Sequence, residues 1–453
     1  MAMTPCPSLK RARTRGAFLP ALGLALAVLV AGAPTLEAQE RSYSDVVPSS
    51  ARTQAGLFHV HQVDDRLLFE IPDSILGRDM AIMSRYAKVQ DGVANGGDRM
   101  GPNLNVQWES REGRVFLRAV SHSNTADPSD NVHVAVQNSN FPPVLASFPI
   151  EARGQGTSVI DVTDLYMGDH PAFSFPRTQR ARLGVRSYDR DRSWMEWARS
   201  FPINVEIRVV RSYAADNPPT DVRGGTLSYE VNHSMILLPE EPMMPRLADE
   251  RVTYISVTQT DYSRDFQGVR PYQYLRRFRL EPSDPEAFAR GELVEPVQPL
   301  IWYIDNATPE EWIPYYKAGL LEWEEAFEEA GFKNALDVRV APSEDEDPEF
   351  SLLDARYSVI RYVATPTRSA NAGGDVVDPR SGEVIRSHMN MYHGLDERLR
   401  WWLVSQVATA NPSFRTSELS EEDLGEAIRY VISHEMAHAL GLPHNQRANF
   451  VFP

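Results

Sequence analysis

With 453 residues, of which 42% are hydrophobic and 24% charged, the chain is long enough for two or three globular domains with a sizeable core. Its formal net charge of −16 argues against nucleic acid as a partner, because surfaces that bind nucleic acid are basic. The single cysteine, Cys6, excludes a disulfide-rich scaffold and leaves no cysteine nucleophile after residue 38.

The first 38 residues have the pattern of a signal peptide. Basic residues between Lys10 and Arg15 precede an apolar run at residues 17–33, and Leu36-Glu37-Ala38 follows it. We expect cleavage after Ala38 and an exported bacterial protein that is periplasmic, at the cell surface or secreted. An uncleaved anchor is the weaker alternative, since Pro20 interrupts a run that is short for a membrane span, and no later segment could span one.

From about residue 55 to residue 285, short alternating apolar runs between turn residues predict a mostly antiparallel β region. Strands are expected at residues 57–63, 66–71, 103–109, 114–120, 203–210, 226–231 and 252–258. Glu112-Gly113 predicts a hairpin turn, residues 191–200 a helix, and the proline-rich residues 238–245 an extended loop.

Prolines at residues 281–299 indicate a boundary, after which the pattern changes to strand, helix, strand. A strand at residues 300–304 leads to Thr308-Pro309-Glu310-Glu311, which predicts a capping box. A long helix should follow, with one apolar stripe from Trp312 to Ala330, and end at Gly331. Further strands are expected at residues 336–341, 357–363, 375–377 and 383–389, and the acidic residues 343–349 predict a solvated loop rather than a calcium site.

A helix near the end of the chain carries a metal-binding pattern. Ser420 and Asp423 predict its start, and Leu424, Ala427, Ile428 and Val431 its buried side. His434 and His438 are four residues apart on one helix face, so both imidazoles can bind one metal ion. Glu435 is rotated by about 100° from His434 and can act as a general base without being a ligand.

Gly441 lets the chain turn back and bring His444 to the metal as a third ligand. Three histidines leave one coordination position open, which is typical of one catalytic Zn²⁺. The predicted reaction is hydrolysis of a peptide bond in a protein or peptide substrate, with Glu435 moving the proton. The histidines at positions 59, 61, 233, 388 and 393 lack ligand spacing, and we expect ordinary surface or core roles for them.

The segment HEMAHALGLPHN resembles the metzincin pattern H-E-x-x-H-x-x-G-x-x-H, which implies a zinc endopeptidase with a five-stranded mixed sheet above a cleft. Other stretches, such as PLIWYIDNATPEEW, VVDPRSGEVI and DRLLFEIPDSILGRDM, resemble the EcxA-like zinc-binding branch of exported bacterial proteins. In that branch two N-terminal domains of unassigned function precede the protease.

The resemblance implies an α+β chain with four parts. These are a signal peptide (1–38), a small β domain (39–90), a β-rich domain (91–295), and a metzincin catalytic domain (296–453) with a mixed sheet and two long helices. Metzincins also carry a methionine-containing turn beyond the third histidine. Because the sequence ends at Pro453, we expect a truncated catalytic domain without its lower subdomain and with low or absent proteolytic activity.

Two other functions compete with this interpretation. A non-catalytic surface or carbohydrate-binding protein could keep a protease-like fold, but it would be expected to lose a ligand or the base. A thermolysin-like enzyme would take its third ligand from a downstream glutamate, whereas Gly441 and His444 already complete a site here.

Overall fold

The structure is a computed structural model that describes residues 41–219, 224–249, 251–264, 268–365, 370–372, 375–416 and 418–445. The predicted signal peptide therefore lies outside the described residues. The chain from Glu40 onward groups into one compact unit, so the predicted boundaries near residues 90 and 295 stay a prediction.

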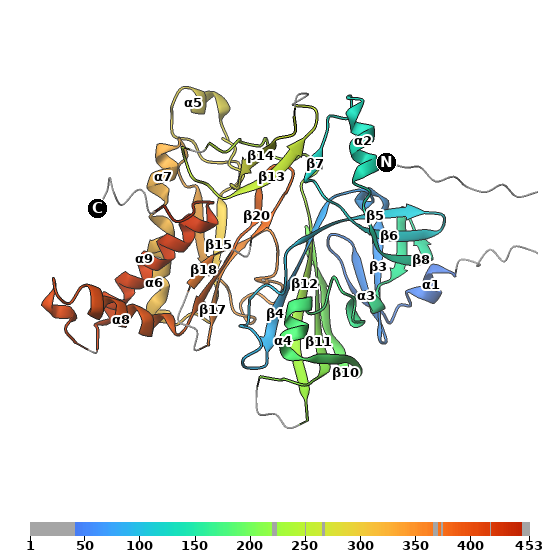
Figure 1. The fold of residues 1–453 in the computed structure, drawn as a ribbon, viewed down its shortest axis with the longest axis horizontal. Helices are drawn as coiled ribbons and strands as arrows, with labels where there is room; N and C mark the ends of the chain where they lie inside the picture. Colours follow the sequence, from blue (N-terminus) through green and yellow to red (C-terminus); the bar gives the residue numbers. More distant parts are fainter. Residues whose placement is uncertain are drawn as a thin grey trace, which may run out of the picture. The chain divides into compact units, whose positions relative to one another are not determined.

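The N-terminal part of the chain forms a large antiparallel sheet, as the alternating sequence pattern predicts (Figure 1). Its strands, in spatial order, are β1 (Arg52–Gln54), β2 (His59–Val63), β3 (Arg66–Pro72), β9 (Thr157–Asp161), β8 (Val144–Gly154), β6 (Arg114–Ala119), β5 (Leu104–Arg111), β4 (Met80–Val89), β12 (Thr226–Leu237), β11 (Asn204–Ala215) and β10 (Val185–Ser200). Strands from either side of residue 90 alternate in this order, because β3 pairs with β9 and β4 with β12. Both segments therefore contribute to one sheet.

One face of this sheet buries the larger apolar core. Trp108, Phe69, Tyr166 and Tyr229 are among its nearly inaccessible side chains, and many of its rings contact one another edge-on or tilted. The predicted turn is confirmed: Glu112 and Gly113 both have positive φ, as a tight two-residue hairpin requires, and Arg111 pairs with Arg114. Short helices connect the strands: α1 (Tyr43–Val46), α2 (Val132–Ser139), α3 (Thr163–Met167) and α4 (Arg177–Leu183).

A smaller sheet joins two strands that follow β12 in sequence to one short strand from the earlier β region. It contains β14 (Pro271–Leu275), β13 (Ser256–Asp261) and β7 (Asn124–Thr125), and α5 (Pro285–Ala289) follows within the predicted proline-rich boundary. The predicted extended loop at residues 238–245 is confirmed, since it contains no helix or regular strand.

The C-terminal part contains the five-stranded mixed sheet. Its order is β16 (Leu336–Val340), β15 (Leu300–Ile304), β17 (Ser358–Val363), β21 (His388–Tyr392) and β18 (Ala370–Ala372), with β18 antiparallel to β21 and the other pairs parallel. β19 (Val376–Val377) and β20 (Val384–Arg386) form a separate hairpin around the predicted turn. The chain is thus a mixed α+β protein.

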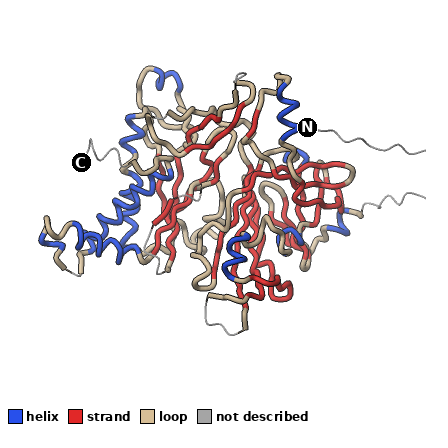
Figure 2. The backbone as a smooth tube through the Cα atoms, viewed as in Figure 1, coloured by secondary structure: helices blue, strands red, loops and turns tan. Residues whose placement is uncertain are grey.

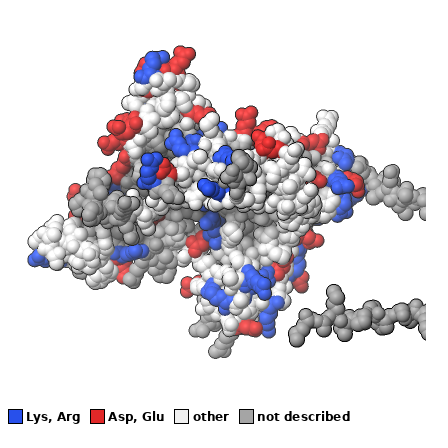
Figure 3. Space-filling view, turned by 45° about the horizontal axis from the view of Figure 1, so that its top comes forward, with Lys and Arg blue, Asp and Glu red and all other residues white. Residues whose placement is uncertain are grey.

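Helices cover the C-terminal sheet on one side, whereas the N-terminal part consists mainly of strands and loops with a few short helices (Figure 2). They are η2 (Glu310–Trp312), α6 (Ile313–Leu321), α7 (Glu324–Glu329), α8 (Leu395–Gln406), η3 (Pro412–Phe414) and α9 (Glu421–Ala439). Alternate residues of β15, namely Leu300, Trp302 and Ile304, share a buried apolar cluster with α6 and α9. On the face shown in Figure 3, acidic and basic side chains are interspersed.

The structure contradicts three of the sequence predictions. Residues 191–200, predicted as a helix, form the end of β10. Bulges near Trp194 and Trp197 interrupt the alternation of side chains along this strand, so its apolar residues recur at a spacing typical of a helix. The single long helix is broken between α6 and α7, where the indole of Trp323 donates to the Ser433 carbonyl of α9. Thr308 forms no capping hydrogen bond, because Pro309 occupies the N-cap position and its side chain has no hydrogen-bonding group.

Candidate metal centre

The helix that carries the histidines, α9, begins as the sequence predicts. The Ser420 hydroxyl accepts a hydrogen bond from the Asp423 backbone N–H at 3.0 Å and donates to the Asp423 carboxylate at 2.7 Å. This cap satisfies a backbone donor that an uncapped helix leaves unpaired. Three acidic residues in the first turn further stabilise the positive end of the helix dipole.

The inner face of α9 packs on the mixed sheet and on α6. Leu424, Ile428, Ile432 and Met436 are buried in the C-terminal apolar cluster, spaced as one face of a helix. The backbones of α6 and α9 approach so closely at Gly319 that a Cβ there would lie 2.5 Å from the Arg429 carbonyl oxygen. This tight packing fixes the direction in which the polar face of α9 points.

Gly441 ends the helix and turns the chain toward His444. Its φ is +99°, a region that glycine enters without strain, and a Cβ would lie 2.4 Å from the Arg276 carbonyl oxygen. Residues near β13 hold the turn: the Tyr254 hydroxyl donates to the Leu440 carbonyl at 2.7 Å, and the Ile255 N–H donates to the Gly441 carbonyl at 2.8 Å. The position of His444 therefore depends on a segment almost 190 residues earlier.

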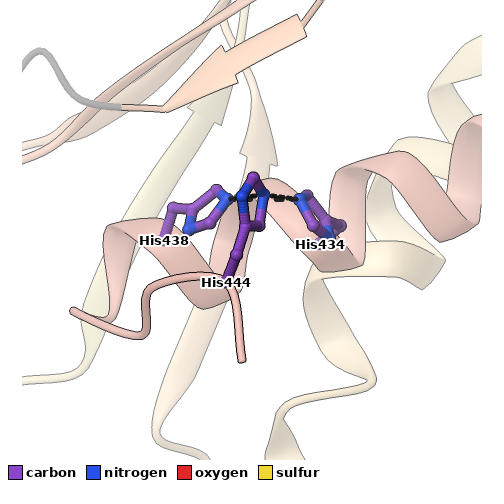
Figure 4. Close-up of side chains that lie close together, drawn as sticks. All are labelled: His434, His438 and His444. Carbon is purple, nitrogen blue, oxygen red and sulfur yellow. Dashed lines mark hydrogen bonds between the residues drawn. The ribbon is translucent and has the colours of Figure 1, made fainter. Parts of the chain in front are cut away.

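The three predicted ligands converge. The Nε2 atoms of His434, His438 and His444 form a triangle with every side 3.1 Å long, and Figure 4 shows the three rings pointing toward one another from α9 and the loop after it. Four ligands at 2.0–2.1 Å around a tetrahedral zinc ion lie about 3.3 to 3.4 Å from one another. The triangle therefore fits three corners of a zinc tetrahedron.

The hydrogen bonding of His438 supports the same fit. Its Nδ1 lies 2.7 Å from the Leu442 carbonyl oxygen, which can only accept, so Nδ1 carries the proton and the neutral ring presents a lone pair at Nε2. Metal-bound histidines commonly donate their other N–H in this way. Burial and then the two neighbouring histidines lower the pKa of His434, which favours the neutral form that binds a metal.

Glu435 lies on the sheet side of α9 and is 8% exposed. Its Oε2 accepts a hydrogen bond from the Ala372 N–H of β18 at 2.7 Å. Burial raises the pKa of Glu435, although the Ala372 bond opposes this shift. An open pocket of about 520 Å³ adjoins the same strand, and its lining includes Arg85, Asp98 and Ala372.

Comparison with known proteins bears on this group of residues. Residues 416–453 match the Met-zincin family model. This stretch contains Glu435 and all three histidines of the centre, and the match supports a zinc metallopeptidase-like region. Residues 40–89 and 97–283 match two domains of unknown function, DUF5118 and DUF5117. No curated protein and no solved structure matches the chain.

Other histidines stay away from the centre, as expected. His233 and His388 are buried, which lowers the pKa of each, and the His393 Nδ1 pairs with the Tyr362 hydroxyl at 2.6 Å. The expectation for His59 and His61 is incomplete, because the structure brings both to Glu70 in a second group that could hold a metal. An H-x-H spacing on a predicted strand could have indicated this group.

Sequence reasoning also missed the residues that hold the centre from outside. Ala372 fixes Glu435 through a backbone N–H, and Tyr254 fixes the helix end. Neither has a sequence signal, because each acts from a distant strand or loop. No helix in the described part of the chain has the length and apolar character needed to cross a membrane.

Proposed function

We propose that the chain is a zinc-dependent endopeptidase of the metzincin type, with one Zn²⁺ held by His434, His438 and His444. The triangle of Nε2 atoms, 3.1 Å on each side, carries this proposal, together with a carboxylate on the adjacent helix position. A structural zinc site would need a fourth protein ligand, and only three side chains converge among the described residues. Zinc, when bound, would polarise the scissile carbonyl and lower the pKa of water.

Glu435 is proposed as the general base. Its carboxylate would accept a proton from the attacking water and pass it to the leaving amine, so the same residue serves both halves of the reaction. The bond from Ala372 would keep the carboxylate in place while its protonation changes.

We further propose that an extended peptide binds beside β18. This strand is the last in the order of its sheet, and extended peptides commonly bind by adding to a sheet edge. Because Ala372 holds Glu435 from the same strand, a peptide aligned with β18 would bring its carbonyl groups near the base. Membership of the EcxA-like branch and export, both expected from sequence, belong to this proposal.

The test separates metal binding from chemistry. In Glu435→Gln the side chain keeps its size but cannot accept a proton, so zinc content should be unchanged while peptide hydrolysis falls by about 100- to 10,000-fold. The control is Glu422→Gln, which alters an exposed glutamate of the same helix and should leave both unchanged. Zinc content is measured by elemental mass spectrometry, and hydrolysis is measured with a fluorogenic peptide library.

Near-normal hydrolysis in Glu435→Gln would remove this residue from the mechanism. Zinc bound by the unaltered chain without any cleavage is the result expected of the alternative, a non-catalytic binding protein with a protease-like fold, and also of a truncated catalytic domain.

A further inference from the structure

The second histidine group lies on the N-terminal sheet, far along the chain from α9. His59 and His61 are two residues apart on β2, so their side chains point to the same face of the sheet. Glu70 of β3 is directly opposite His59 in the register of the antiparallel pair. Neighbouring positions on one face bring side chains to within about 5 Å, and diagonal ones such as His61 and Glu70 remain within reach.

The donor atoms of these three side chains are close enough to share an ion. The His61 Nε2 lies 3.1 Å and the His59 Nδ1 3.3 Å from the Oε2 of Glu70. One donor atom from each residue lies within 4.8 Å of the other two. The two nitrogen-to-oxygen separations are near the ligand-to-ligand distance of about 3.3 to 3.4 Å around tetrahedral zinc.

Surrounding hydroxyl groups orient the donors. The Thr157 hydroxyl donates to Glu70 Oε1 at 2.6 Å, which leaves Oε2 to face the histidines. The Tyr43 hydroxyl donates to Oε2 at 2.8 Å, and the Thr53 hydroxyl lies 2.8 Å from His61 Nδ1. Metal ligands in proteins are commonly fixed by hydrogen bonds of this kind.

The Glu70 carboxyl group lies in a buried position. Its oxygen atoms accept hydrogen bonds from the hydroxyl groups of Thr157 and Tyr43. Among the described residues no lysine or arginine forms an ion pair with Glu70. A buried carboxylate is usually paired with a positive group or a metal.

Access to the group is from one side. The side chain of His59 is 52% exposed, whereas those of His61 and Glu70 are 1% and 8% exposed. An ion could therefore enter past His59, and solvent could supply a fourth ligand there.

From these observations we infer a second metal site, in which His59, His61 and Glu70 bind a zinc ion. Nitrogen and carboxylate ligands in a set of two histidines and one glutamate suit zinc. The site is independent of the proposed protease function, since it shares no residue with the α9 centre. The competing explanation is a hydrogen-bond network in which both histidines donate to Glu70 without a metal.

The experiment counts zinc in the full chain after chelation, reloading with zinc sulfate and desalting. The unaltered chain should hold two zinc ions, and His59→Ala and Glu70→Gln one each. His133→Ala, which changes a histidine of α2 that contacts a backbone carbonyl, should still hold two. His438→Ala should also hold one, and the double variant His59→Ala/His438→Ala none.

Failure of this inference can be told apart from failure of the proposed protease. If His438→Ala holds no zinc, or if His59→Ala holds as much as the unaltered chain, the second site is overturned whatever the α9 centre does. Because His59 is half exposed, its replacement should leave folding intact, which circular dichroism checks. Thr157→Val, which removes only the bond that orients Glu70, should weaken zinc binding in the His438→Ala background by about 10- to 100-fold. Unchanged affinity there would assign Thr157 no role in orienting the ligand.

Discussion

The two histidine groups span similar distances along the chain, 10 residues from His434 to His444 and 11 from His59 to Glu70, but different kinds of structure assemble them. His434, His438 and His444 come together through one helix and one glycine turn, so their convergence is determined locally. The group around Glu70 depends on the pairing of β2 with β3, and its Thr157 partner lies 87 residues beyond Glu70. Residue spacing on one helix therefore predicts the first group, whereas the second also requires the register of the β2–β3 hairpin and a partner from β9.

The largest effect should come from removing one ligand of the local group. His438→Ala leaves two of the three protein ligands, too few to hold zinc tightly, and peptide hydrolysis should fall by at least about 1,000-fold. The N-terminal sheet should be unaffected, because no residue of α9 belongs to its core. Metal analysis and a peptide cleavage assay check the loss of zinc and of hydrolysis. A nearly unchanged far-ultraviolet circular dichroism spectrum would show that the N-terminal sheet is intact. Full activity in this variant would contradict the ligand assignment.

A pH-dependent effect of intermediate size should test how the N-terminal sheet is joined to the second half of the chain. Glu206 of β11 is buried and accepts hydrogen bonds from Asn204 and Ser234, and Asn204 also donates to the Leu353 carbonyl. Burial raises the pKa of Glu206 to about 7, against the bonds that favour its charged form. Because the folded chain then holds its proton more tightly than the unfolded chain, the free energy of unfolding should fall as pH rises from about 4.5 to 7.

Replacing this residue by an amide that does not titrate removes the effect. Between pH 5 and pH 8 the unaltered chain should lose more unfolding free energy than Glu206→Gln, by at most about 3 kcal/mol. Denaturant unfolding at both pH values measures the difference, with Glu329→Gln, an exposed position on α7, as the control. An equal loss in the chain and in Glu206→Gln would show that Glu206 is ionised at both pH values.

The smallest effect should show that a distant residue also supports the α9 centre. Tyr254→Phe removes the bond to the Leu440 carbonyl and should lower the free energy of unfolding by about 1 kcal/mol. It should weaken zinc binding by about 10-fold, because the turn that presents His444 loses an outside support. Tyr430→Phe, which alters a tyrosine of α9 that is 61% exposed, is the matched control. Identical zinc affinities for the two variants would show that the Tyr254 hydroxyl does not support zinc binding at the α9 centre.

Most strands and the α9 centre could be predicted from sequence because their signals are short-range. Alternation predicted β2, β3, β5 and β6 to within two residues, and residue spacing predicted the convergence of the three histidines. The bulges in β10 place apolar residues at a spacing that is typical of a helix. The apolar stripe of residues 312–330 does not reveal the interruption at Trp323, where the indole binds the Ser433 carbonyl of α9. The bond from Ala372 to Glu435 depends on strand order, which spacing does not encode, and the pairing of His59 with Glu70 depends on the register of the β2–β3 hairpin.

The central claim is that α9 and the loop after it form a zinc centre, and the most direct test is to locate the metal. Crystals of the zinc-loaded chain, measured on both sides of the zinc absorption edge, should show an anomalous peak about 2.0 to 2.1 Å from the Nε2 atoms of His434, His438 and His444. A zinc-containing chain with no anomalous peak at these three nitrogens would contradict the account.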